Sequence, residues 1–211
     1  MGDVNFGKIA IMFAVFLFST ACHEAAHAWM AWRWGDSTAK DEGRITLNPM
    51  PHIDPMGTLL LPLIVLFMSG GNSIMGWAST PVNKSRMSDP RWGDFWTSAA
   101  GPLTNLLLAL VSIVVYKALV ATGAMSGEYG DALRFLLTTM VWLNLFLMVL
   151  NFLPIPPLDG GHMLENLLPS NMAGVFEHIR PFGLIILIAL SSSGLLNNLT
   201  DPLIRWAYSL L

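Results

Sequence analysis

Charged side chains are scarce in this sequence. Only 12% of its 211 residues are Asp, Glu, Lys or Arg, whereas a soluble domain usually carries about 25%. The hydrophobic share is 54% and the mean hydropathy is +0.55. The net charge of −3 comes without a run of like charges, so no nucleic-acid partner is expected. Most of the surface must therefore face apolar helices or lipid, and we expect the bilayer to surround this chain.

Cysteine is almost absent, which excludes an internal disulfide. The single cysteine, Cys22, adjoins a histidine, but a small core residue is the simpler interpretation. Repeats and low-complexity tracts are lacking too. The longest polar stretch, Trp34–Pro55, is too short to form a separate soluble domain. We therefore expect one domain over residues 1–211.

Long apolar runs predict an all-α polytopic membrane protein. Three runs reach the roughly 20 residues that a spanning helix needs, namely Lys8–Met30, Ala99–Val120 and Ala132–Leu153. Phe182–Leu196 is a shorter fourth candidate. Met56–Met68 is too short and contains a proline, so it is predicted to re-enter the membrane rather than cross it. The first run stays apolar beyond a signal-peptide-like "AHA", so we expect a retained helix.

Within the first run, "HEAAH" places His23 and His27 one helical turn apart. Side chains at this spacing lie on one face about 5–6 Å from each other, so both imidazoles can bind a single zinc ion. Glu24 lies about 100° around the helix and can reach a water without being a ligand. This HExxH pattern is typical of metal-assisted hydrolysis with the glutamate as general base. Histidines that merely pack between helices are the plainer alternative, but unpaired ionisable groups are costly inside a membrane.

A hydrolytic zinc ion takes three protein ligands and leaves one position open. The third ligand has several candidates besides the carboxylates, namely Cys22, His52, His162 and His178. The strongest is Asp159 in "NFLPIPPLDGGHM". Prolines there end an apolar helix, and two glycines permit a close approach. Irregular backbone at membrane depth is tolerated only where it is enclosed or lines a cavity, so a carboxylate there is a functional candidate.

Three motifs in this order carry a family resemblance: "HEAAH", "AGPLTN" (residues 100–105) and "NFLPIPPLDGG" (151–161). Together they resemble the site-2 protease family of intramembrane zinc metalloproteases, over residues 8 to 165. The resemblance implies that His23, His27 and Asp159 hold one zinc ion per chain, with Glu24 as the base. We expect residues 8–165 to form a three-helix catalytic core, with further helices over 181–211.

The same resemblance implies roles for two asparagines, and two further histidines are expected to have supporting roles. Asn151 matches a family asparagine near the substrate carbonyl, and Asn105 matches the asparagine of the family's GPxxN motif. His162 is expected to support the site without binding zinc, and so is His52, unless it forms part of a turn. "GWASTPVN" (76–83) departs from the relatives' usual lysine and extra proline.

Residues 35–62 resemble the short form of the family, which is common in prokaryotes and lacks an inserted PDZ domain. "GRITLN" (43–48) alternates apolar and polar residues with period two, which predicts a strand, and "IMGWAST" (74–80) could pair with it. We expect a small membrane-associated β-hairpin or sheet whose edge binds an unwound substrate segment. The expected partners are membrane proteins with helix-destabilised transmembrane segments.

The basic residues predict the orientation. Most of them follow the first helix on one side of the membrane: Arg33, Lys40, Arg44, Lys84, Arg86 and Arg91. By the positive-inside rule this side is the cytoplasm, so the N-terminus lies outside and the active site nearer the cytoplasmic face of the cell membrane.

The predicted function is an intramembrane zinc endopeptidase that cleaves transmembrane segments, in regulated intramembrane proteolysis. A metal transporter would predict inverted repeats, which are not seen, and would leave Glu24 without a role. A catalytically inert homologue that binds membrane segments is the other alternative, and an intact HExxH argues against it.

Overall fold

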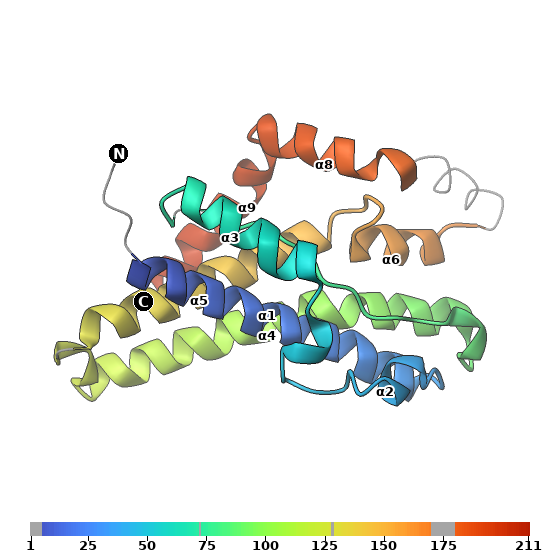
Figure 1. Ribbon diagram of the computed structural model, residues 1–211, viewed down its shortest axis with the longest axis horizontal. Helices are drawn as coiled ribbons and strands as arrows, with labels where there is room; N and C mark the ends of the chain where they lie inside the picture. The colour runs from blue at the N-terminus through green and yellow to red at the C-terminus, as the bar shows by residue number, and fades with distance from the viewer. Residues whose placement is uncertain (1–5, 72, 128, 170–179) are drawn as a thin grey trace.

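The computed structural model describes residues 6–71, 73–127, 129–169 and 180–211, and these are mostly helical. Three of the described helices are long and apolar enough to cross a membrane: α1 (Phe6–Arg33), α4 (Pro90–Ala121) and α5 (Gly130–Asn151). These three helices run side by side along the longest axis of the molecule, and consecutive helices of the three are antiparallel (Figure 1). The predictions of a mostly helical chain and of three helices long enough to span a membrane are confirmed.

Helix α4 begins earlier than the apolar run suggests. Asp89 caps it, because its carboxylate accepts hydrogen bonds from the backbone N–H groups of Arg91 and Trp92, and Pro90 occupies the first turn. "AGPLTN" therefore lies inside the helix, and Pro102 interrupts the helical hydrogen bonds there. Hydropathy missed this start because the first turns are polar.

Small side chains let the three long helices approach closely. Ala28 and Ala31 of α1 and Ala109 of α4 are completely buried, as is common where membrane helices pack. Between α1 and α5, Val15 and Phe16 contact Leu143. By contrast, the outward face of α4 exposes Leu107, Val111 and Val114, among others. This apolar face is suited to contact lipid.

The connection between α1 and α4 leaves and returns at the same end of α1. It contains α2 (Thr38–Asp41), the short turns η1 (Met50–His52), η2 (Pro55–Leu60) and η3 (Lys84–Arg86), and α3 (Leu61–Met68). Phe67 of α3 makes an edge-on ring contact with Phe6, near the start of α1. The extended residues 73–83 then lead back, and Ser88 N donates to Trp34 O at 2.8 Å, just beyond the end of α1.

Asp36 fastens the two ends of this connection together. Its buried carboxylate accepts hydrogen bonds from the backbone N–H of Thr38 at 3.0 Å and from that of Asn83 at 2.6 Å. Burial raises the pKa of Asp36, but the hydrogen bond from the Thr38 hydroxyl and the two backbone bonds, together with the charge of Arg86, outweigh it, so its pKa lies below the ordinary value. The return of the chain to this end of α1 is thus held by a buried charge-assisted contact.

The predicted β-hairpin is wrong for the described residues. Residues 43–48 form a turn followed by bends, and residues 74–80 belong to no strand. Local bonds turn the first segment, since Asn48 N bonds the Thr46 hydroxyl and Met50 N bonds Asn48 Oδ1. Such side-chain bonds compete with strand pairing. The extended segment instead contacts η2, where Trp77 N donates to Gly57 O.

The C-terminal part forms shorter helices. These are α6 (Asp159–Leu167), the turn η5 (Arg180–Phe182), α8 (Gly183–Ser192) and α9 (Leu195–Ser209). A turn at Gly194, with φ 74°, interrupts the predicted span Phe182–Leu196. At about 1.5 Å per residue, α8 is too short to cross a bilayer. Helix α9 packs Ile204 and Ala207 against α4 and α5.

Candidate metal centre

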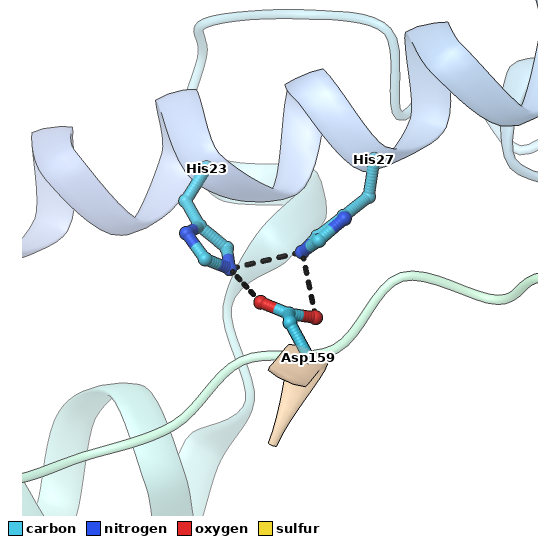
Figure 2. Close-up of side chains that lie close together, drawn as sticks. All are labelled: His23, His27 and Asp159. Carbon is cyan, nitrogen blue, oxygen red and sulfur yellow. Dashed lines mark hydrogen bonds and ion pairs between the residues drawn. The ribbon is translucent and has the colours of Figure 1, made fainter. Parts of the chain in front are cut away.

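Three side chains from α1 and α6 converge on one point. His23 Nε2 and His27 Nε2 lie 2.9 Å apart, and the carboxylate of Asp159 lies 3.2 Å from the first and 3.4 Å from the second. Figure 2 shows the two imidazoles pointing from α1 towards the carboxylate at the first residue of α6. Both histidines are buried. In the described residues, this is the one cluster of three metal-ligating side chains.

The backbone before α6 positions Asp159 next to the two histidines. Helix α5 ends at Asn151, and a proline-rich turn leads directly into α6. Gly160 lies so close to this turn that a Cβ there would be 2.4 Å from the carbonyl oxygens of Phe152 and Leu153. Only glycine permits this approach, which places Asp159 opposite α1.

The other ring nitrogen of each histidine faces α4. His27 Nδ1 lies 2.7 Å from the carbonyl oxygen of Thr97, and His23 Nδ1 lies 2.6 Å from Asn105 Oδ1. Pro102 lies close to both contacts and has no N–H for the carbonyl of Ser98, the residue after Thr97, so the helical hydrogen bonds are interrupted in this part of α4. Helix α4 thus supplies the oxygen atoms that orient both rings.

These contacts decide the chemistry of the cluster. A carbonyl oxygen only accepts, so Nδ1 of His27 donates, and in the neutral ring Nε2 keeps its lone pair. The same holds for His23 facing the amide oxygen. Two lone pairs and a carboxylate crowded together repel one another unless a cation lies between them. Ligands about 2.0–2.1 Å from a tetrahedral zinc ion lie about 3.4 Å apart, close to the observed separations. The residues therefore fit zinc.

Gly101 is a site residue that sequence reasoning missed. A Cβ there would lie 2.5 Å from Nε2 of both His23 and His27. Helix α4 can therefore approach the two imidazoles only because this position has no side chain. The signal was present in the sequence as the glycine of "AGPLTN", but its meaning depends on how α1 and α4 cross.

Glu24 is buried beside the cluster, and the extended segment lies against it: the Thr80 hydroxyl donates to Glu24 O at 3.1 Å. A cavity of about 180 Å³ adjoins His27 and Asp159. Its other walls come from α4, α6, η3 and the segment before η3: Val82, Lys84, Asp94, Thr97, Ser98 and His162. The centre therefore has room beside it for reacting groups.

The remaining predicted residues lie at different distances from this centre. Asn151 is half-buried at the end of α5, and its side chain makes no hydrogen bond within the described part of the chain. His162 lines the cavity from α6. His52 is buried away from the cluster, where its Nε2 bonds Thr46 O at 3.0 Å. Cys22 is buried and outside the cluster, and His178 lies outside the described residues.

Comparison with known proteins identifies the family. The family model for peptidase family M50 matches residues 11–129 and 118–190. The chain belongs to peptidase family M50, the site-2 protease family. The resemblance of its three motifs is thereby confirmed.

Curated relatives match most of this M50 chain. "Putative zinc metalloprotease YwhC" of Bacillus subtilis is 36% identical over 82% of this chain and 76% of its own length. "Putative zinc metalloprotease Rip2" of Mycobacterium tuberculosis is 31% identical over 97% and 75%, and its namesake in Mycolicibacterium smegmatis is 29% identical over 96% and 74%. No solved structure matches the chain significantly.

Proposed function

We propose that this chain is an intramembrane zinc endopeptidase that hydrolyses peptide bonds in transmembrane segments of other membrane proteins. One observation carries the proposal: His23, His27 and Asp159 converge where two of them lie on a helix long and apolar enough to span a bilayer. A metal site on such a helix has to act within or beside the membrane. The names of the relatives support the metal and the reaction class.

Each residue near the centre has a chemical task in this proposal. His23, His27 and Asp159 hold one zinc ion per chain, and zinc bound there supplies Lewis acidity that lets water lose a proton near neutral pH. Glu24 accepts that proton at its buried carboxylate. Asn151 is proposed to bind the substrate carbonyl, because its amide has no partner within the described residues.

The same geometry supports a placement in the membrane. Residues 34–89 leave and return at one end of α1, which supports a re-entrant course for α3 and no net crossing. The cluster lies nearer that end, since His27 is six positions from Arg33. With the basic residues at the same end, we place this face in the cytoplasm. The proposed substrates are helix-destabilised transmembrane segments that are cut in regulated proteolysis.

Substitutions separate zinc binding from catalysis. Glu24→Gln keeps the shape of the side chain but cannot accept the proton, so the purified protein should keep about one zinc ion per chain and stop cleaving a helical membrane substrate. His23→Ala and Asp159→Ala each remove a ligand, so zinc content should fall together with cleavage. Metal analysis and a cleavage assay in detergent measure both quantities.

Three outcomes would contradict parts of this proposal. Cleavage by Glu24→Gln at the wild-type rate would exclude Glu24 as the base. Unchanged zinc affinity in Asp159→Ala would show that the third ligand lies elsewhere. A wild-type protein that holds zinc but cleaves no membrane substrate would favour the inert homologue instead.

A further inference from the structure

A buried polar relay leads from His23 into the middle of the helix bundle. Asn105, whose oxygen faces His23, donates from Nδ2 to Asn144 Oδ1 at 2.8 Å. Asn144 Nδ2 in turn donates to the backbone carbonyl of Met140 and to the hydroxyl of Ser19, both at 2.9 Å. The side chains of Ser19, Asn105 and Asn144 are 0% exposed. The relay therefore joins α1, α4 and α5 away from solvent, and the proposed reaction leaves Asn144 without a task.

The direction of every bond in the relay follows from its last acceptor. The carbonyl of Met140 only accepts, so the amide nitrogen of Asn144 must face it and the amide oxygen must face Asn105. Asn105 then presents its nitrogen to Asn144 and its oxygen to His23. His23 must donate from Nδ1, and the lone pair of its neutral ring remains on Nε2.

Asn105 alone does not choose between the two ring tautomers. Turned by 180°, its amide would offer a nitrogen to His23 Nδ1, which would then accept. The hydrogen of the neutral ring would move to Nε2, the atom that faces Asp159 at 3.2 Å, and would block it as a metal ligand. The amide of Asn144 prevents this turn, because it offers Asn105 only an acceptor.

We propose that Asn144 is a positioning residue: through Asn105, it holds His23 in the tautomer that can bind zinc. The inference rests on the zinc site proposed above. Burying an amide in an apolar helix is costly unless it is fully bonded, and Asn144 uses both its oxygen and its nitrogen. Loss of such outer partners typically lowers metal affinity about 10- to 100-fold.

A matched pair of variants tests this role. Asn144→Leu keeps the branched shape of the side chain but removes the relay, so zinc affinity should fall at least about tenfold. Ser19→Ala removes a buried bond at the same depth but leaves the path from Met140 through Asn144 to His23 intact, so zinc affinity should stay within about twofold of wild type. Competition against a chelator, with the full chain in detergent, measures zinc affinity, and thermal melting measures stability. Equal zinc affinity in Asn144→Leu and wild type, or equal losses in both variants, would overturn the proposal.

A measurement on the unmutated protein keeps the test valid if Asn144→Leu does not fold. NMR of the zinc-loaded chain with nitrogen-15-labelled histidine should show the hydrogen of the His23 ring on Nδ1. The His23 resonance is assigned as the one that is lost in His23→Gln. Zinc coordinated through Nδ1 would overturn the relay. A wild-type chain that binds no zinc would instead contradict the proposed function, and the tautomer found in it would still decide the direction of the relay.

Discussion

At the scale of single residues, Gly101 sets how closely α4 approaches the two histidines. Gly101→Ala would place a methyl group 2.5 Å from both Nε2 atoms, so the rings must turn or α4 must shift. Overpacking lowers the stability of the fold by about 1–3 kcal/mol, and the better helix propensity of alanine raises it by about 1 kcal/mol. We therefore expect a small change in melting temperature and at least a tenfold loss of zinc affinity, measured by chelator competition.

Gly93→Ala is the matched control for Gly101→Ala on the same helix. A Cβ at Gly93 would meet the side chain of Met87, whose sulfur lies 2.7 Å away and can move, and whose Cβ lies 3.2 Å away. Zinc affinity should therefore stay at the wild-type value in this variant. A Gly101→Ala protein that binds zinc as tightly as Gly93→Ala would show that the close approach has no consequence for the metal.

Some residues of the site could be predicted from the sequence, and others could not. His23 and His27 were predictable, because a helix converts their spacing into a shared face. Asn144 had a weaker signal, as a lone amide in the middle of an apolar helix. Its partner Asn105 lies 39 positions away, so only the packing of α4 against α5 reveals the relay.

At the scale of elements, a polar clamp fixes the far end of α6 on α4. Asn166 Nδ2 donates to the buried carboxylate of Asp94, and Arg91 donates to the carbonyl oxygens of Asn166 and Leu167. Lys84 also contacts Asp94, at 2.8 Å. Because Asp159 is the first residue of α6, a clamp at the other end limits how far the carboxylate can move from the histidines.

Removing the Asn166 side chain should loosen α6 without removing a ligand. Asn166→Ala loses two hydrogen bonds, to Asp94 and to His162 O, each worth about 1 kcal/mol. We expect faster amide hydrogen exchange in α6 and a zinc affinity that is lower by a factor of about 5–30. Arg205→Ala, which removes an exposed contact on α9, should change neither quantity. Unchanged exchange in α6 would show that other contacts hold this helix.

Errors at this scale have local causes. Period two over six residues predicted a strand at 43–48, but Thr46 and Asn48 bond nearby backbone and bend the chain. Hydropathy placed the start of α4 at Ala99, whereas the cap at Asp89 starts it at Pro90. Composition identifies the apolar middle of a helix, but its ends depend on specific polar contacts.

At the scale of the whole molecule, the path of the chain brings the three motifs together. Helix α1 ends and α4 begins at the same end of the bundle, and α5 runs towards that end (Figure 1), which requires the connection between α1 and α4 to return to where it started. The contacts of Asp36 and Ser88 show that it does so. The shorter candidate Phe182–Leu196 is not among the three spanning helices of the described residues, since hydropathy does not register the turn at Gly194.

This course of the chain predicts which positions share a side of the membrane. Cysteines introduced at Lys40 and Lys84 should both resist an impermeant thiol reagent added outside intact cells, because both lie at the basic end of the bundle. A cysteine at Thr122, after α4 has crossed, should be labelled. The native Cys22 is buried and provides an unreactive background. Labelling of only one of the first two positions would mean that α3 or the extended segment completes a crossing, and the re-entrant course would then be wrong.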